Sequence, residues 1–193
     1  LDHFPVRTTD ITGLFIQHAL TQLRSEGRAV LVVPEGFLFR GGPERKLRRM
    51  LVEQHTVEAV VSLPAGAFLP HTGIKASVLL LRRGGLTKHI RMVDAEFYFE
   101  KGKGRKPATI QPEQIHKLTE EVRTPSPSKN CWDVDIESLV KVGWDFTPKR
   151  RDRSGLLGIL DALRSEVDVF PLKECCKVLS GRTFPRDQLL EEP

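Results

Sequence analysis

The stretch Arg28-Ala-Val-Leu-Val-Val-Pro34 decides the fold class of this chain. It is a short apolar run, rich in β-branched residues and closed by a proline, which is typical of a strand buried on both faces. Strands of this kind lie in the middle of parallel sheets, so we expect a central, parallel strand here. A central strand needs a neighbour on each side, and this requirement predicts an α/β sheet.

Segments with helical and strand periodicity lie on both sides of this strand. Apolar residues recur at helical spacing over residues 10–26, and Gly27 follows where a helix C-cap would lie. A second helix is expected over residues 43–54, with a basic face formed by Arg45, Lys46, Arg48 and Arg49. Further strands are expected at 57–63, 76–83 and 89–98, and a further helix at 111–122. This order predicts half of a doubly wound sheet with one unpaired edge, which implies another strand upstream.

The remainder of the chain is more irregular in composition. A basic glycine loop covers residues 101–106, and residues 124–130 and 149–153 have the composition of linkers. A small unit with Trp132 and Trp144 lies between those linkers, and residues 155–167 place apolar side chains at helical spacing. We therefore expect a main domain over residues 1–123, a linker with a small tail unit over 124–153, and a helix that begins a further unit over 154–193.

Composition narrows the class of protein. The chain has 193 residues and a formal net charge of +5, which favours a polyanionic partner only slightly. No apolar run approaches the roughly 20 residues of a membrane span, and no leader peptide opens the chain. Cys131, Cys175 and Cys176 cannot all pair, and they lack the spacing of zinc ligands. These features predict a cytoplasmic protein without a membrane partner or a metal site.

An ordered series of motifs over residues 10–83 gives the chain a family resemblance. The motifs are Thr12-Gly-Leu-Phe15, Gly27-Arg-Ala-Val-Leu-Val-Val-Pro-Glu-Gly36, Leu38-Phe-Arg-Gly-Gly42, Val60-Val-Ser-Leu-Pro64 and Gly73-Ile-Lys-Ala-Ser-Val-Leu-Leu-Leu81. Each motif alone is weak, but the series with these gaps closely resembles the modification (M) subunit of type I restriction-modification systems. The pieces after residue 83 are similar to the same family but less distinctive.

The resemblance implies a site-specific DNA methyltransferase that transfers a methyl group from S-adenosylmethionine to adenine N6. It also implies the fold: the C-terminal half of a Rossmann-like methyltransferase sheet, followed by a small α-rich appendage. In the family, the cofactor loop and the Asn-Pro-Pro-aromatic motif both precede the segment that begins at Asp10, and this sequence contains neither. We therefore expect an incomplete cofactor site, no catalytic residue in this fragment, and no activity of the fragment alone.

The resemblance also suggests residues for the cofactor and the flipped base. Phe15 and the neighbouring Leu14 lie on the helix that flanks the cofactor adenine in the family, although both have the character of ordinary core residues. Phe68 lies in the loop of residues 63–75, which resembles one wall of the pocket that receives the extruded adenine. The alternative for Phe68 is that its ring plugs the end of the sheet.

Polar residues of two loops are candidates for contact with double-stranded DNA. They are Thr72 and Lys75, with Lys101, Lys103 and Arg105 in the basic glycine loop. The alternatives are that His71 and Thr72 bond their own loop and that the cations form a solvated face. Arg45, Arg48 and Arg49 are weaker candidates, for which a solvated helix face is the preferred interpretation. No Ser, His and Asp set with a nucleophile elbow is recognisable, which argues against a hydrolase.

Partner proteins follow from the same resemblance. We expect a specificity (S) subunit or a fused recognition domain, and a restriction subunit is a further candidate. The tail Phe170-Pro-Leu-Lys-Glu-Cys-Cys-Lys-Val-Leu-Ser-Gly-Arg-Thr-Phe-Pro185 is similar to openings of target-recognition domains, and an ordinary terminal strand and turn is the alternative. Two other functions stay open: a non-catalytic module that binds DNA or another subunit, and a different Rossmann-like nucleotide enzyme.

Overall fold

The computed structural model describes residues 4–102, 104, 106–124 and 127–148. Those residues belong to one compact unit, Leu1–Lys149, and the second unit, Arg150–Pro193, falls beyond them. The expected helix at 155–167, the tail at 170–185, Cys175, Cys176, Lys103 and Arg105 therefore lie outside the described residues.

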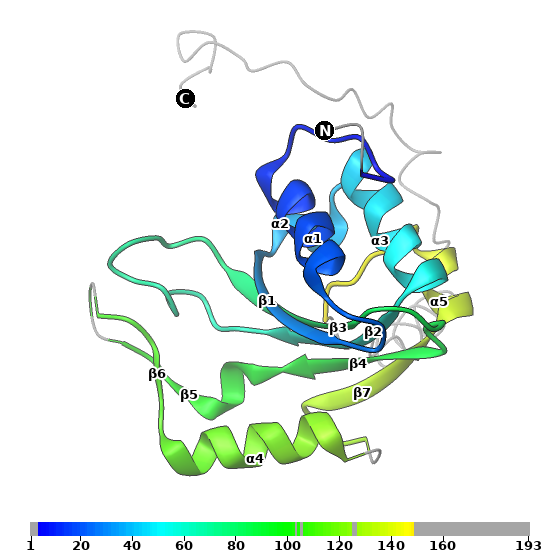
Figure 1. Ribbon diagram of the computed structural model, residues 1–193. Coiled ribbons are helices and arrows are strands. Elements are labelled where there is room, and N and C mark those ends of the chain that lie inside the picture. Colours follow the sequence, from blue (N-terminus) through cyan, green and yellow to red (C-terminus); the bar gives the residue numbers. More distant parts are fainter. Residues whose placement is uncertain (1–3, 103, 105, 125–126, 149–193) are drawn as a thin grey trace, which may run out of the picture. The chain divides into compact units, whose positions relative to one another are not determined.

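A five-stranded mixed sheet forms the centre of the described unit (Figure 1). Its strands are β1 (Arg28–Pro34), β2 (Thr56–Ser62), β3 (Ala76–Arg82), β4 (His89–Asp94) and β7 (Cys131–Asp135). They lie in the order β1-β3-β2-β4-β7, in which β2 and β4 are parallel and the other neighbouring pairs are antiparallel. A separate two-stranded sheet joins β5 (Phe99–Glu100) to β6 (Thr109–Ile110). The predicted α/β class is confirmed.

The position of β1 corrects one prediction. β1 lies at the edge of the described sheet and pairs only with β3, antiparallel to it, so the prediction of a central and parallel strand is wrong for these residues. The apolar character on both faces misled that prediction. Val33 is buried against the helices, whereas Val30 and Val32 on the other face are 67% and 58% exposed. The expected unpaired edge is thus present.

Helices cover the two faces of the sheet unequally. One face carries α1 (Ile11–Gln22), the short α2 (Gly36–Phe39) and α3 (Pro43–Gln54), and α5 (Ile136–Lys141) joins the same core. The other face is covered only in part, by α4 (Pro112–Arg123), which packs through Leu118 and Val122 near Val61 and Val93 (Figure 1). No helix of the described residues is both long and apolar enough to cross a membrane.

The start of α1 follows the sequence, but its end does not. Asp10 caps the helix because its carboxylate accepts a 3.0 Å hydrogen bond from the N–H of Gly13. The helix ends at Gln22, with Leu23 as the C-cap. Glu26, not Gly27, takes the left-handed conformation, with a φ of 60°. The predicted Gly27 C-cap is therefore wrong: Gly27 closes the following turn through its bond to the Arg24 oxygen.

Residues 131–146 belong to the main core. β7 pairs along β4, and Trp132 and Trp144 pack against the large apolar cluster that also contains Leu47 and Leu51 of α3. A bidentate ion pair fastens β7: Arg91 of β4 donates from Nε and Nη2 to the two carboxylate oxygens of Asp133 at 2.8 and 2.7 Å. The hydrogen bonds to Asp133 raise the pKa of Arg91, which keeps this buried guanidinium charged.

Candidate functional site

The carboxyl edge of the sheet gathers the segments in which the site residues are expected. β2 and β4 are parallel, so their carboxyl ends meet at one edge, where open α/β sheets usually bind their ligands. β1 ends at the same edge, because Pro34 pairs with Ala76, the first residue of β3. The edge is built from the turn after β1, the loop of residues 63–75, and the 3₁₀ helix η1 (Ala95–Tyr98) after β4.

The 63–75 loop is held in place by its neighbours. The N–H of Glu35 donates to the oxygen of Lys75 at 2.9 Å, and Lys75 Nζ lies 3.5 Å from the Glu35 carboxylate. The N–H of Ala108 donates to the oxygen of Gly66 at 3.1 Å, so the segment leading into β6 lies against the middle of the loop. The loop and the β5–β6 hairpin therefore project together from one end of the sheet (Figure 1).

The predicted base-stacking residue lies on the outside of this loop. Phe68 is 38% exposed and belongs to neither apolar core of the described residues, so the alternative in which its ring plugs the sheet is wrong. Its main-chain oxygen accepts hydrogen bonds from the N–H groups of His71 and Thr72 at 3.0 and 3.1 Å. The Thr72 hydroxyl accepts from Ile74, as the local-bonding alternative expects. The ring of Phe68 remains available for stacking.

The predicted cofactor residues lie on α1. Phe15 is 58% exposed, whereas the next residue, Ile16, is fully buried in the core. The interpretation of Phe15 as an ordinary core residue is therefore wrong. Leu14 is half-buried. An exposed aromatic ring offers an apolar surface against which a purine could stack.

The basic hairpin is described only in part. Lys101 is exposed, and its Nζ lies 3.7 Å from the Glu96 carboxylate of η1. Lys103 and Arg105 are not among the described residues. A long, exposed ion pair of this kind contributes little, so the charge of Lys101 is available to an anionic ligand.

Arg48 departs most clearly from the expectation of a solvated basic face. Its side chain is only 1% exposed. The guanidinium donates to three main-chain oxygens, those of Trp144 (2.6 Å), Phe37 (2.5 Å) and Arg40 (2.8 Å), and it lies 6.0 Å from the ring centres of Phe37 and Phe146. Burial lowers its pKa to about 10. Arg48 therefore cannot contact DNA; it holds the segment after β1 against residues 144–146.

Two buried serines near the carboxyl edge were missed from the sequence. Ser62 and Ser77 face each other across β2 and β3, and both side chains are buried. The Ser77 hydroxyl has no hydrogen-bond partner among the described residues. The only sign of these two serines in the sequence is that each is a polar residue within an otherwise apolar strand. No cluster of three or more His, Cys, Asp or Glu side chains in the described part of the chain is placed to hold a metal ion.

Comparison with known proteins gives a consistent family. The model of the N-6 DNA Methylase family matches residues 3–154. The methylase subunit of the type I restriction enzyme EcoEI from Escherichia coli is 37% identical over 90 residues, which are 46% of this chain and 18% of that protein. The methylase subunit of the MpnII enzyme from Mycoplasma pneumoniae is 37% identical over 137 residues, 69% of this chain and 24% of its own length.

Solved structures agree with this family. One solved structure, from work on complex assembly in a type I restriction-modification system, matches 84% of this chain. The match covers 38% of the other chain, with 30% identity and a TM-score of 0.65. The type I methyltransferase subunit from Streptococcus thermophilus matches 70% of this chain. The match covers 28% of that subunit, with 26% identity and a TM-score of 0.64. The chain spans less than a quarter of the two curated relatives above. Because the family model covers most of its residues, the chain belongs to the N-6 DNA methylase family.

Proposed function

We propose that this chain forms part of an enzyme that methylates adenine N6 in DNA, as the methylase component of a type I restriction-modification system. The observation that carries the proposal is the family match over residues 3–154, which includes the whole five-stranded sheet. The curated relatives are named as methylase subunits of type I restriction enzymes, which supports the same assignment.

The chemistry sets what the site must do. The exocyclic amine of adenine is a poor nucleophile because its lone pair is delocalised into the ring. Catalysis therefore needs acceptor groups against the amine and close alignment with the methyl donor. The target base must also leave the duplex, which costs roughly a few kcal/mol. The exposed Phe68 ring on the anchored 63–75 loop would recover part of this cost by stacking, and Thr72 and Lys75 follow it on the same loop.

S-adenosylmethionine would supply the methyl group when bound. The described residues fit only part of a site for it: exposed Phe15, with Leu14 beside it, provides an apolar wall for the adenine ring of the cofactor. In the described sheet, no strand is followed at the carboxyl edge by the glycine-rich turn that binds the cofactor in Rossmann-like folds. We therefore infer that the chain alone holds an incomplete cofactor site and no acceptor for the target amine, and that it does not catalyse by itself.

DNA and other subunits are the proposed partners. Lys101, which directly follows β5, would contact phosphates next to the Phe68 loop, because β5 and this loop project from one end of the sheet. Lys103 and Arg105, which lie outside the described residues, stay candidates for DNA contact from their sequence alone. A specificity subunit or a fused recognition domain would select the target sequence, with a restriction subunit in the full assembly.

The domain boundaries expected between residues 123 and 124 and between residues 153 and 154 stay predictions.

One observation favours the alternative of a binding module without chemistry. Lys101 is exposed and only weakly paired, whereas the sequence contains no Asn-Pro-Pro-aromatic motif to hold the adenine amine. Such a module would bind duplex DNA and would not bind the cofactor even when completed by the rest of a methylase subunit.

Calorimetric titration of this chain with S-adenosylmethionine separates these cases. We expect no binding by the chain itself and recovery of binding when it is extended upstream in its gene. Micromolar binding by the unextended chain would show that the cofactor site is complete and would contradict the inferred incompleteness. Absence of binding in the extended protein would favour the binding module over the methyltransferase.

A further inference from the structure

A pocket with a volume of about 500 Å³ lies between η1 and α4. The lining residues that matter below are Phe97, Tyr98, Lys117, Glu120, Glu121 and Asn130. None of the described residues proposed above for the cofactor, the flipped base or DNA lines this pocket. A ligand bound here would therefore be distinct from the substrates of the proposed methyl transfer.

The Glu121 carboxylate in this pocket lacks a positive partner. Its Oε1 accepts a 3.1 Å hydrogen bond from the Ser128 hydroxyl. Its Oε2 is buried and has no hydrogen-bond partner among the described residues, and none of the ion pairs between those residues includes Glu121. A water molecule would satisfy the hydrogen bond but would leave the charge without a counterion, so a cationic donor from outside would be favoured here.

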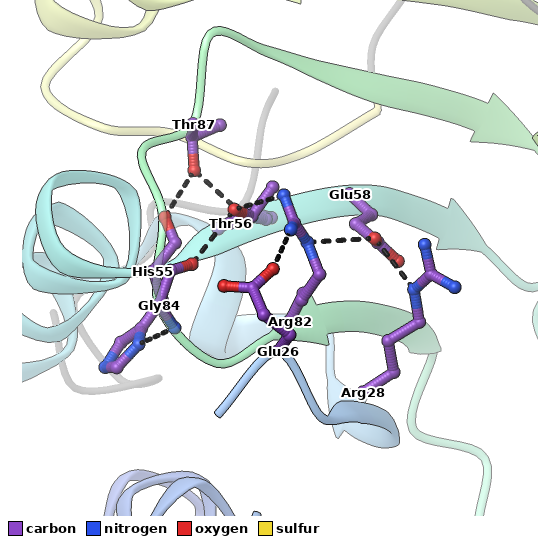
Figure 2. A network of polar contacts seen from close by, with 9 residues as sticks. Glu26, Arg28, His55, Thr56, Glu58, Arg82, Gly84 and Thr87 are labelled. Carbon is purple, nitrogen blue, oxygen red and sulfur yellow. Dashed lines mark hydrogen bonds and ion pairs between the residues drawn. The ribbon is translucent and has the colours of Figure 1, made fainter. Parts of the chain in front are cut away.

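A comparable carboxylate in the same chain is satisfied by arginine. Glu58 is half-buried, like Glu121. Its Oε1 lies 2.9 Å from Nε of Arg28 and 3.6 Å from Nε of Arg82 (Figure 2). Glu121 thus lacks the guanidinium that Glu58 has.

The main chain holds Glu121 in a fixed place. Nη1 of Arg91 donates a 3.1 Å hydrogen bond to the Glu121 oxygen, and the Cys131 thiol donates to the same oxygen at 3.5 Å. With the Ser128 bond on Oε1, these contacts fix both the backbone and the side chain of Glu121. A ligand that bonds the free Oε2 would therefore lose little free energy to reordering of the site.

An exposed aromatic ring stands at the same pocket. Phe97 is 76% exposed, and its ring meets that of Tyr98 at 87°, with 6.1 Å between their centres. Tyr98 itself is buried, and burial followed by the neighbouring Glu121 carboxylate raises the pKa of Tyr98 to about 12. Tyr98 therefore stays neutral, and the open Phe97 ring offers a surface on which a flat cation can stack.

The cation of the pocket itself is a weak competitor. Lys117 lies four residues before Glu121 on α4, is exposed, and forms no ion pair with any residue that the structure describes. A lysine placed before a glutamate at this spacing is the weaker of the two orders, and an exposed pair of this kind contributes little. Glu120 is exposed and adds a second carboxylate to the lining. Lys117 would therefore not keep an incoming cation out.

The chemistry of the lining selects the occupant. DNA phosphates would be repelled by the two carboxylates. No group of three or more ligating His, Cys, Asp or Glu side chains for a metal ion exists among the described residues. A lysine ammonium would match the charge but not the flat ring. An arginine guanidinium does both, because it is planar, stacks on aromatic rings and donates in parallel to a carboxylate.

We propose that the pocket between η1 and α4 binds an arginine side chain presented by another protein, with the guanidinium held by the Phe97 ring and the Glu121 carboxylate. Arginine and aromatic side chains are enriched among the residues that anchor protein interfaces, which favours a protein as the source of the guanidinium. The proposal does not depend on the proposed methyl transfer.

NMR titration of the whole chain with three short peptides tests the proposal. The peptides are acetyl-Gly-Ala-X-Ala-Gly-amide, in which X is arginine, lysine or citrulline, the neutral isostere of arginine. We expect the arginine peptide to shift the amide resonances of Phe97, Tyr98 and Glu121. The lysine peptide should bind at least about threefold more weakly, and the citrulline peptide should not bind.

Two variants test the two contacts. Glu121→Gln should weaken binding of the arginine peptide about tenfold, because the charge is lost while the amide oxygen can still accept from Ser128. Phe97→Ala should weaken it about threefold, through loss of the cation–π contact. The matched controls are Glu113→Gln, at an exposed position of α4 outside the pocket, and Phe39→Ala, where a ring is 52% exposed on α2. Neither control should change binding, and the two-dimensional spectrum verifies that each variant folds.

Several outcomes would overturn the proposal. Binding of the citrulline peptide as tight as that of the arginine peptide would remove the role of charge, as would equal losses in Glu113→Gln and Glu121→Gln. Equal binding of the lysine peptide would assign the pocket to ammonium groups in general. Equal binding of methylguanidinium would assign it to a small cation, and shifts of the same resonances by duplex DNA would assign it to phosphates. Cofactor binding by the extended protein is measured separately, so failure here is distinct from failure of the methyltransferase assignment.

Discussion

The Nε atom of Arg48 donates a 2.6 Å hydrogen bond to the main-chain oxygen of Trp144, 96 residues further along the chain. The same guanidinium bonds the oxygens of Phe37 and Arg40, so one side chain joins α3, the segment after β1, and the end of the described chain. Because the segment after β1 borders the carboxyl edge, Arg48 helps to fix the geometry of the candidate site by holding this segment in place.

Replacement of Arg48 by methionine is expected to destabilise the fold strongly. Methionine fills much of the volume but leaves three buried carbonyl oxygens without their donor, at a cost of about 3 kcal/mol in the free energy of unfolding. Urea denaturation measures this difference. The control is Arg49→Met on the same helix, where an exposed ion pair with Glu53 is lost at a cost of about 0.5 kcal/mol or less. Equal effects of the two substitutions would show that Arg48 does not hold these segments together.

His55 is expected to make stability depend on pH. It caps α3, and its Nδ1 accepts a 3.0 Å hydrogen bond from the N–H of Gly84. Burial and the nearby Arg83 lower the pKa of His55 below its ordinary value of 6.5. Folding thus favours the neutral ring, so the contribution is fully present above the unfolded pKa and is lost as the pH falls through 6.5 toward the folded pKa.

The pH dependence is isolated by comparing variants. The free energy of unfolding of the wild-type chain, measured from about pH 8 to pH 5, should fall more steeply than that of His55→Gln, whose amide oxygen can still accept from Gly84. His18→Gln serves as the control because His18 is exposed on α1. Parallel curves for wild type and His55→Gln would rule out His55 as the source of the slope.

The Arg91–Asp133 pair should secure the edge strand β7. Asp133→Asn replaces a bidentate carboxylate by a neutral amide beside a buried guanidinium, which is expected to cost about 1 to 2 kcal/mol. Hydrogen exchange should rise selectively at the amides of β7, because β7 pairs only with β4. Glu53→Gln, which removes an exposed pair, should leave β7 protected; a uniform rise in exchange across the sheet would argue against a local role of Asp133.

The sequence predicted the elements well and the neighbourhood of Arg48 badly, for physical reasons. Periodicity and turn residues report local structure, so α3 spans the expected residues 43–54, and β2 and β3 match their predictions within one residue. Burial of Arg48 depends on three carbonyl oxygens, two of them from the segment after β1 and one from residue 144. No helical pattern encodes such contacts, and the four adjacent cations suggested a solvated face.

The position of β1 and the environment of Phe15 show the same limit. An apolar run indicates that both faces of a strand can be buried, but it does not indicate which neighbouring elements cover each face. In the described sheet, β3 pairs with β1, and Val30 and Val32 stay exposed. Phe15 had the spacing of a core residue, yet Ile16 occupies the core, because the buried stripe of α1 runs through Gly13, Ile16, Gln17 and Leu20.

Gly85 is expected to tolerate no side chain. Its φ is +78°, and a Cβ added there would lie 2.7 Å from Oγ1 of Thr56. Gly85→Ala should therefore lower the free energy of unfolding by about 1 to 2 kcal/mol. Gly41→Ala is the matched control, since a Cβ at Gly41 meets no atom within 4 Å. A loss at Gly41 as large as that at Gly85 would show that the turn after β3 is not strained by the side chain.

Salt dependence should distinguish the two described lysines proposed to meet DNA. Lys75 already lies beside the Glu35 carboxylate and is 35% exposed, whereas Lys101 is 85% exposed and only loosely paired with Glu96. Each phosphate neutralised by a free cation contributes about 0.9 to the slope of log binding constant against log salt concentration. Lys101→Met should reduce that slope by nearly this amount and Lys75→Met by clearly less, because the Glu35 carboxylate already neutralises Lys75.

Fluorescence anisotropy with a duplex between about 50 and 200 mM salt measures both slopes. Lys141→Met, at an exposed position of α5, is the control that should change neither affinity nor slope. If Lys101→Met leaves the slope unchanged, the β5–β6 hairpin does not contact the phosphates, and the proposed DNA surface fails at its most exposed residue.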